Sequence, residues 1–293
     1  MIKNILKYYY DFSECNIKYN NDSYIINFNS EWFYFCPIKS GFNDLRDQYS
    51  LNVDINNFYP NASKIILNKF GNIITLFEKT NYILIRIGMS RNFNFEFIDF
   101  NYSKYKSLYR NEWAKLWGEK IDYFEFKLEH FKGRNKGIDK YFDFFCGLTE
   151  NAIYLVQEVR EKYNDLPLSI QHKRYNNFFY DNPINLIVDY RVRDCAETIK
   201  YKYLYENISI LDIEEYISKH DYNKGELELL YARLLYPSLY FDILDKTIYS
   251  DYSSANFEEY EVIFSNYLNF LKFINQIKYF DGISKNVFWI KKS

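Results

Sequence analysis

The spacing of apolar residues changes once along this chain, and that change limits the possible folds more than any other feature. Before Gly88, β-branched and aromatic residues come in short runs that turn-forming clusters separate. Such runs predict strands, which we place at 16–19, 23–28, 32–36, 63–69, 72–78 and 82–87. A helical spacing of apolar residues interrupts them over 42–58, where we predict one helix.

From Tyr102 onward the apolar residues follow helical stripes. The stripes predict helices at 105–131, 139–162, 193–205, 211–218, 224–249 and 257–279. The pattern breaks between Leu166 and Tyr190, where Pro167 and Pro183 flank two short apolar runs. We therefore expect an α+β protein, with a strand-rich part up to Gly88 and a helical part that contains one short β insertion.

Charge and composition argue against several classes of protein. With 37 basic and 39 acidic residues the net charge is −2, so the chain has no long-range field for DNA or RNA phosphates, and we expect no nucleic-acid partner. No apolar stretch approaches the roughly 18 residues of a membrane span, and the first residues lack the apolar core of a leader, so we expect a cytoplasmic protein without a span. The four cysteines are too widely spaced for a disulfide framework or a zinc site.

Several segments of the second part resemble a known family. They are LWGEKIDYFE (116–125), GLTENAIYLV (147–156), INLIVDYRVRDCAETIK (184–200) and ELLYARLLYPSLYFDI (228–243). These segments are similar to the spore coat-associated, YutH-type branch of the superfamily that contains aminoglycoside phosphotransferases and choline kinases. The resemblance implies a two-lobed protein kinase-like fold, with a small antiparallel β N-lobe over 1–88 and a larger helical C-lobe over 89–293. It also implies a bacterial protein of the spore coat or spore surface, with other spore coat proteins as partners.

The segment 166–190 corresponds to the catalytic loop of this superfamily, whose active members read His-Gly-Asp-x-x-x-x-Asn and then a strand that ends in Asp-Phe or Asp-Trp. One Asp accepts the proton of the attacking hydroxyl, while the Asn and the second Asp hold magnesium. Here His172 matches the histidine, but Arg174 stands in the place of the catalytic Asp and Phe179 in that of the Asn. Arginine cannot accept a proton near neutral pH, because its pKa is above about 12. Asp189 matches the metal-binding Asp. It is therefore the one residue kept of the three that carry the chemistry in active members.

Alternatives remain at these positions. Asp189 could hold a metal or only fix a turn, and His172 is expected to be structural. A shifted register would offer Asn176, Asn177 or Asp181 in place of Arg174. We also predict that His172 on a loop and Asp189 at a strand end share one cleft, and that the Arg174 guanidinium pairs with the Asp189 carboxylate.

The strand-rich part also departs from an active kinase-like lobe. Its first turn lacks glycine, its third strand reaches no lysine until Lys39 beyond Pro37, and residues 40–77 contain no glutamate. Asp44 or Asp47 could pair with Lys39, a pair that would be exposed. After the insertion, Arg193 and Asp194 open a helix and are expected to have an architectural role.

Two functions from different classes follow. The first is a non-catalytic, kinase-like protein (a pseudokinase) of the endospore coat, which acts as a structural or interaction component and needs no cofactor. The alternative is a small-molecule phosphotransferase that uses ATP and magnesium, with Asp189 as metal ligand. A third possibility, intermediate between these two, is a scaffold that binds a nucleotide without turning it over.

Overall fold

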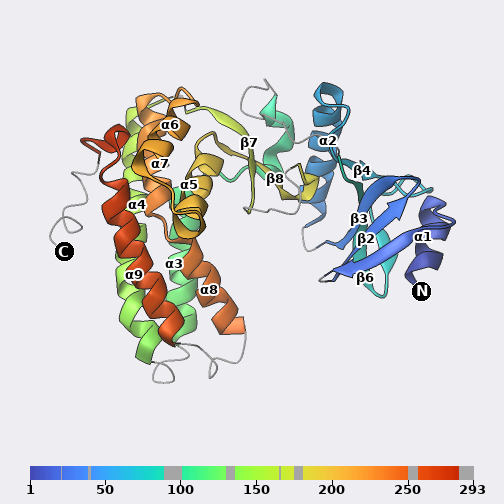
Figure 1. Cartoon of the computed structure of the whole chain (residues 1–293), viewed down its shortest axis with the longest axis horizontal. Coiled ribbons are helices and arrows are strands. Elements are labelled where there is room, and N and C mark those ends of the chain that lie inside the picture. Colours follow the sequence, from blue (N-terminus) through green and yellow to red (C-terminus); the bar gives the residue numbers. More distant parts are fainter. Residues whose placement is uncertain are drawn as a thin grey trace. The chain divides into compact units, whose positions relative to one another are not determined.

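The computed structural model describes residues 1–20, 22–38, 41–88, 101–129, 136–164, 166–174, 181–249 and 257–283 (Figure 1). The chain forms two compact units. The first consists of Met1–Arg110 and Ser169–Asp189, and the second of Asn111–Leu168 and Tyr190–Ser293. Most of the insertion therefore groups with the strand-rich part. A lobe boundary near Gly88 stays a prediction, because residues 89–100 lie outside the described part.

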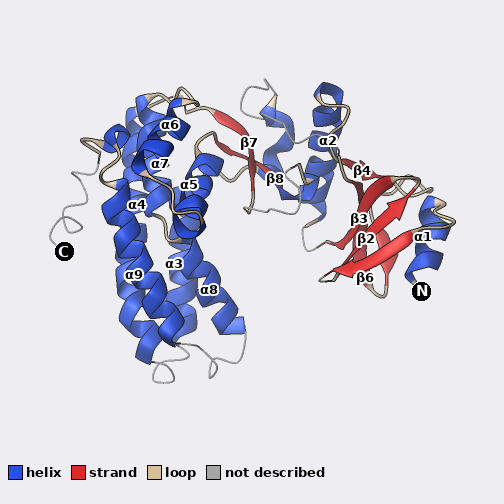
Figure 2. Cartoon of the chain, viewed as in Figure 1, coloured by secondary structure: helices blue, strands red, loops and turns tan. Residues whose placement is uncertain are grey.

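An antiparallel sheet forms the centre of the first unit, as predicted (Figure 2). Its strands run in the order β1-β2-β3-β6-β4, and β5 also pairs with β6, at residues 80–82, whereas β4 pairs with residues 84–86 of that strand. The bounds are β1 (Asn16–Asn20), β2 (Ser23–Phe28), β3 (Glu31–Pro37), β4 (Lys64–Ile66), β5 (Thr75–Phe77) and β6 (Thr80–Arg86). Alternation along β3 gives each face of the sheet its own core, with Phe33 and Phe35 on one face and Tyr34 and Cys36 on the other.

One helix contributes to the core on each face of this sheet. Helix α1 (Ile2–Tyr10) buries Leu6 in the core that contains Phe35. Helix α2 (Phe42–Phe58) contributes Leu45 to the core that contains Cys36. The prediction of α2 is confirmed, whereas α1 was not predicted, although Ile2, Ile5 and Leu6 already have helical spacing.

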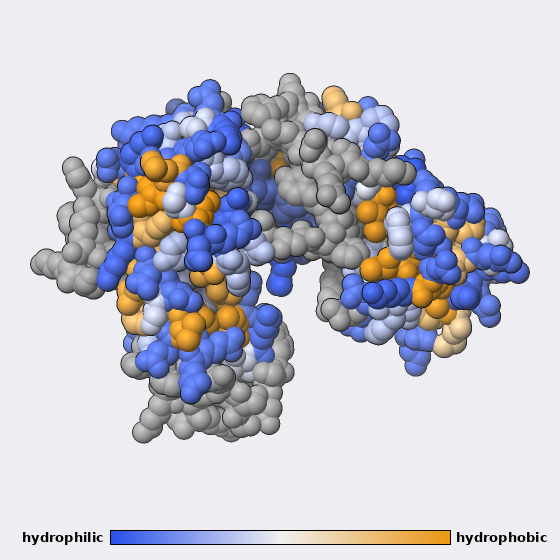
Figure 3. Space-filling view, in the orientation of Figure 1, coloured by the Kyte–Doolittle hydropathy of each residue, from blue (hydrophilic) through white to orange (hydrophobic). Residues whose placement is uncertain are grey.

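The second unit is a helical bundle. Its helices are α3 (Trp113–Glu129), α4 (Lys136–Lys162), α5 (Arg193–Tyr205), α6 (Ile210–Ser218), α7 (Lys224–Leu235), α8 (Ser238–Tyr249) and α9 (Phe257–Ile274), and the short 3₁₀ helix η5 (Lys278–Phe280) follows. Helix α7 is buried on nearly all sides. Figure 3 shows apolar residues reaching the surface as separate patches on each unit. Within the described residues, no helix is long and apolar enough to cross a membrane.

Three of the predicted helices differ from the structure, and the one expected over 257–279 ends at Ile274, before the 3₁₀ helix η5. The one expected over 105–131 begins only at Trp113, and a 3₁₀ helix, η2 (Tyr102–Leu108), precedes it. The one expected over 224–249 is two helices, α7 and α8, separated at Pro237. Proline has no backbone N–H and disfavours helical geometry in the residue before it, and Tyr236 accordingly has an extended ψ of 118°.

Candidate functional site

The insertion folds as a two-stranded hairpin of β7 (Leu168–His172) and β8 (Leu186–Tyr190), with the 3₁₀ helix η3 (Pro183–Asn185) before β8. The Lys173 N–H donates to the Asn185 carbonyl at 2.7 Å, and the Arg191 N–H donates to the Pro167 carbonyl at 3.2 Å. This pattern of bonds is antiparallel. His172 therefore lies at the Asn185 end of the hairpin, and Asp189 lies near the Pro167 end.

The structure alters the expected arrangement of these two residues. His172 is the last residue of β7 rather than part of a loop, and it is 8% exposed. Asp189 lies at the end of its strand, as predicted, and is 0% exposed. Because the two residues lie at opposite ends of an antiparallel pair, the hairpin does not bring their side chains together.

Arg174 does not pair with Asp189, contrary to the prediction. Its side chain is exposed, and among the described residues no ion pair joins it to any carboxylate. The reason is local, because Arg174 follows the end of β7 that lies away from Asp189. Phe179, Asn176, Asn177 and Lys39 lie outside the described residues.

The Asn185 side chain holds the backbone of Arg174 on both sides. The Arg174 N–H donates to Asn185 Oδ1 at 3.1 Å, and Asn185 Nδ2 donates to the Arg174 carbonyl at 2.8 Å. Next to Asn185, the Ile184 carbonyl accepts a hydrogen bond from Gln48 Nε2 of α2 at 2.9 Å. These bonds connect Arg174 through η3 to helix α2, and we call them the Asn185 clasp.

Asp181, the carboxylate that a shifted register would have offered as a base, anchors the loop instead. It is 5% exposed, and both of its oxygens accept hydrogen bonds from Ser63, one from the backbone N–H and one from Oγ at 2.8 Å. Burial raises the pKa of the Asp181 carboxyl, although the bonds from Ser63 act in the opposite direction. Ser63 Oγ also accepts from the Gly88 N–H at 2.8 Å. We call these three residues the Ser63 anchor.

Gly88 has a steric reason to be glycine at this point. A Cβ atom there would lie 2.5 Å from the Asn61 carbonyl oxygen and 2.6 Å from the Ser63 nitrogen. Both are backbone atoms and cannot rotate away. Only glycine therefore allows the end of β6 to approach the Ser63 anchor this closely.

Three carboxylates of α2 bind to the segment 104–110 rather than to a strand lysine. Asp44 lies 3.2 Å from Arg110 Nη2, Asp47 accepts from Ser107 N–H at 3.1 Å and Ser107 Oγ at 2.7 Å, and Asp54 accepts from the Tyr105 hydroxyl. Burial, and then the bond to Asp54, raise the pKa of Tyr105. The acids that could have paired with Lys39 thus have other partners.

The strand that would supply a lysine presents apolar and aromatic groups to α2. Tyr34 and Cys36 of β3 lie in the same core as Leu45 of that helix. Burial raises the pKa of the Cys36 thiol to about 12, so it stays protonated at neutral pH. Within β3, which is fully described, there is no lysine.

Charged side chains also gather inside the second unit, where α5 meets α7. Arg233 Nε donates to Glu197 Oε1 at 2.8 Å, and the Lys200 ammonium lies 3.5 Å from the same oxygen. The Arg233 guanidinium also lies over the Trp113 ring, 5.1 Å from its centroid. Burial raises the pKa of Glu197, but Lys200 and Arg233 outweigh it and lower that pKa to about 2. Burial lowers the pKa of Lys200 to about 8.

Sequence analysis missed this cluster, because Arg233 lies in an otherwise apolar stripe, 36 positions after Glu197. The only sequence signal of the cluster was the segment Arg193-Asp194-x-Ala196-Glu197. We interpreted the start of this segment as having an architectural role. Asp194 does lie in the first turn of α5, where a carboxylate complements the helix dipole.

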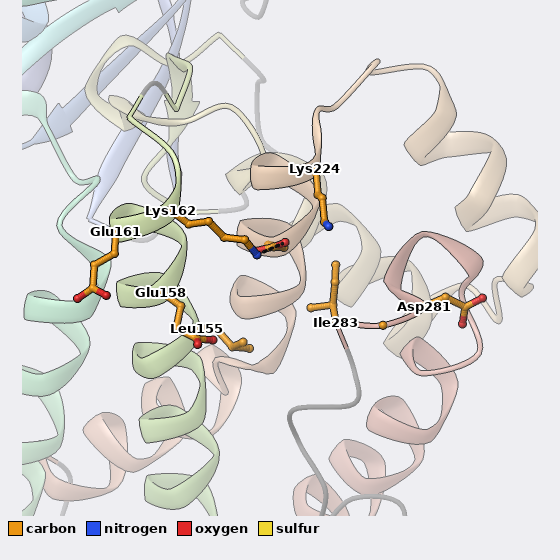
Figure 4. A pocket seen from close by; sticks show the side chains of 9 residues that line it. Leu155, Glu158, Glu161, Lys162, Lys224, Asp281 and Ile283 are labelled. Atoms are coloured by element: carbon orange, nitrogen blue, oxygen red, sulfur yellow. Dashed lines mark hydrogen bonds and ion pairs between the residues drawn. The ribbon is translucent and has the colours of Figure 1, made fainter.

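A pocket of about 530 Å³ opens on the second unit between α4, α7 and the residues after η5 (Figure 4). Glu158 and Glu161 line it, and Lys162 crosses it to reach Glu228 at 3.2 Å. None of the candidate site residues predicted from the sequence lines this pocket. Among the described residues there is no group of three or more side chains that could hold a metal ion.

Comparisons with known proteins identify the family. Residues 3–277 match the family described as "Spore coat putative kinase YutH". The "Endospore coat-associated protein YutH" of Bacillus subtilis (strain 168) is 27% identical over 198 residues, which cover 58% of this chain and 56% of that protein. The match thus spans just over half the length of this curated relative.

Solved structures of kinases share the fold. Spectinomycin phosphotransferase, in complex with ADP and spectinomycin, has a TM-score of 0.52 and 11% identity, covering 100% of this chain and 98% of that one. The microcompartment-associated aminopropanol kinase has a TM-score of 0.54 and 8% identity over 95% and 98% of the two chains. These likenesses confirm the predicted kinase-like α+β fold, and the chain belongs to the YutH family of spore coat proteins.

Proposed function

We propose that this chain is a non-catalytic, kinase-like component of the endospore coat that works as a structural or interaction protein. The observation that carries the proposal is the state of Arg174, which stands where the superfamily has its proton-accepting Asp. Its side chain is an exposed cation, and its backbone is fixed by the Asn185 clasp. A guanidinium at this position cannot take a proton from a substrate hydroxyl.

The other carboxylate in the described part of this loop does not supply a replacement base. A general base needs an oxygen within reach of the proton that it removes. Asp181 is buried, and Ser63 occupies both of its oxygens. Using Asp181 as a base would require the Ser63 anchor to open.

The surroundings of α2 support the same proposal. A kinase-like lobe positions phosphates through a strand lysine paired with a helix carboxylate. Here the carboxylates of Asp44, Asp47 and Asp54 bind the segment 104–110. The helix is thereby fixed through these carboxylates, and strand β3 supplies no lysine to pair with them.

The described residues do not fit a magnesium site either. Magnesium needs a near-octahedral set of oxygen ligands, usually one or two carboxylates together with phosphates and water. Asp189 is fully buried, and the described residues contain no group of three or more side chains that could hold a metal ion. We therefore propose that Asp189 is structural and that neither ATP nor magnesium is a cofactor.

The place of action follows from the family. Because the chain belongs to a family of spore coat proteins, we propose that it contacts other coat proteins through its surfaces. The match to the B. subtilis relative covers just over half of that protein. The binding of coat proteins by this chain is therefore proposed from the family alone. Locating a tagged copy in a sporulating cell would test the place of action.

Titration with ATP and magnesium tests the proposed absence of catalysis. A ligand that binds only the folded protein stabilises it by about 2.7 kcal/mol at 100 times its Kd. We expect no shift of the melting temperature at millimolar ATP and no ATP turnover. A shift together with turnover that Asp189→Ala abolishes would establish the phosphotransferase instead. A shift without turnover would indicate a nucleotide-binding scaffold.

A further inference from the structure

The Asn185 clasp does more than hold a turn, because it fixes the backbone from which an exposed charged side chain extends. Both backbone polar groups of Arg174 bind the Asn185 side chain, and the preceding N–H, that of Lys173, binds the Asn185 carbonyl. The clasp in turn rests on α2 through Gln48. The start of the Arg174 side chain is therefore placed by folding and not by a partner.

Among the described residues, no carboxylate pairs with the guanidinium of Arg174. Asp181 is engaged with Ser63, and Asp189 is fully buried. No ion pair of Arg174 occurs within the described ranges, whereas Arg110 of the same unit is paired with Asp44. An exposed arginine with a fixed backbone and no ion pair among the described residues is suited to an external anion.

We propose that Arg174 is the docking residue for an acidic segment of a partner protein, with carboxylates as the recognised groups. This inference rests on the proposed function as an interaction component and names the chemistry of the partner. A guanidinium presents paired N–H donors that match a carboxylate, and the clasp lowers the cost of ordering the arginine on binding. The net charge of −2 means that the chain as a whole does not attract acidic proteins, so the attraction is local.

Binding of a fluorescein-labelled hexaglutamate peptide to the full chain tests the inference. Fluorescence anisotropy is measured at about 0.01 M ionic strength, where surface charges are weakly screened. Hexalysine of the same label is the peptide control and is expected not to bind at the same site. A phosphoserine peptide without carboxylate side chains distinguishes phosphate from carboxylate recognition.

Three substitutions locate the binding. Arg174→Gln removes the charge and should weaken hexaglutamate binding about fivefold, the equivalent of about 1 kcal/mol for an exposed ion pair. Asn185→Ala keeps the charge but releases the clasp, and should weaken binding about twofold. Arg46→Gln is the matched control, since Arg46 is an exposed arginine on α2 of the same unit. It should leave binding unchanged.

Melting temperatures of all three variants check that the fold is retained. Equal losses at Arg174 and Arg46, no binding by the parent chain, or binding of the phosphoserine peptide alone would each overturn the inference. ATP turnover measured on the same samples keeps the two proposals apart. Turnover by the parent would refute the proposed function and leave Arg174-dependent docking in place, whereas absent docking without turnover would refute only the inference.

Discussion

A largely buried carboxylate lies in each compact unit, and the two are held by opposite kinds of partner. In the first unit Asp181 accepts hydrogen bonds from the uncharged amide and hydroxyl of Ser63, and burial raises its pKa. In the second unit Glu197 faces Arg233 and Lys200, and its pKa falls to about 2 in spite of burial. The charge of the partner therefore decides whether a buried carboxylate favours its neutral or its ionised form.

The two carboxylates also differ in what their loss should cost. A group held by neutral donors can be replaced by an amide of the same shape. A group held by cations leaves an uncompensated charge when one partner is removed.

Removing Arg233 should destabilise the second unit strongly. Arg233 is 5% exposed, and Arg233→Met removes the cation that donates a hydrogen bond to Glu197, at an expected cost of about 3–5 kcal/mol in the free energy of unfolding. Urea denaturation measures this. Arg160→Met is the matched control, because Arg160 pairs with Glu112 at 2.8 Å on the surface and should cost less than about 1 kcal/mol. Equal losses of stability in Arg233→Met and Arg160→Met would show that burial does not determine the cost of removing an arginine from its ion pair.

The pH dependence of stability should have opposite signs for the two carboxylates. Glu197 has its folded pKa lowered from 4.5 to about 2, so its contribution is present above 4.5 and is lost as pH falls toward 2. Asp181 has its folded pKa raised above 3.8, so ionisation makes folding less favourable as pH rises above that value.

Denaturation of Glu197→Gln and Asp181→Asn across pH 3 to 7 separates these contributions. Relative to the parent, Glu197→Gln should lose stability with rising pH, by about 2 kcal/mol between pH 3 and pH 7. Asp181→Asn should instead gain relative stability as pH rises. The same slope for both variants would contradict the assignment of partners.

Substitution of Gly88 probes the close approach at the Ser63 anchor. Gly88→Ala places a methyl group 2.5 Å from a backbone oxygen and should destabilise the first unit by about 1–3 kcal/mol. Gly118→Ala in α3 meets nothing within 4 Å and should stabilise by about 0.5–1 kcal/mol, because alanine favours a helix. Thermal unfolding of the two variants should therefore shift in opposite directions, and a shift in the same direction would refute the steric account.

Breaking the ion pair of Asp44 and Arg110 should cost less stability than any of the changes above other than the controls. Both side chains are 28% exposed, so Asp44→Asn should cost at most about 1 kcal/mol. The cost should shrink in high salt, which screens exposed charges more than buried ones. Chemical denaturation at low and high salt checks this, and a loss that salt leaves unchanged would mean that the pair behaves like the Glu197 cluster.

The fold was largely predictable because apolar spacing and turn residues are local signals. The hairpin of β7 and β8 follows from two short apolar runs flanked by Pro167 and Pro183, and both strands are confirmed. Helix α1 was missed because its aromatic end resembles the start of a strand. The break at Pro237 was missed because the apolar stripe continues through it.

The candidate site was less predictable because its contacts join distant positions. The sequence showed Arg174 and Asp189 as possible partners, but it could not show that the Asn185 side chain would hold Arg174 at the other end of the hairpin. The sequence offered Lys39 as a possible partner of Asp44 or Asp47, but it could not show that these acids would bind residues about sixty positions later. Polar partners at such separations leave no periodic signal.

The first unit is discontinuous, and this has a consequence for the nascent chain. Ser63 and Gly88 lie in its first stretch, but Asp181 lies in its second, 118 positions after Ser63. A ribosome that has synthesised only Met1–Arg110 has therefore made the sheet without the carboxylate that receives the Ser63 amide. At roughly 5–20 residues per second, several seconds pass before that carboxylate emerges. A polypeptide truncated before Asp181 should thus remain susceptible to proteases around Ser63, even though it contains every strand of the sheet.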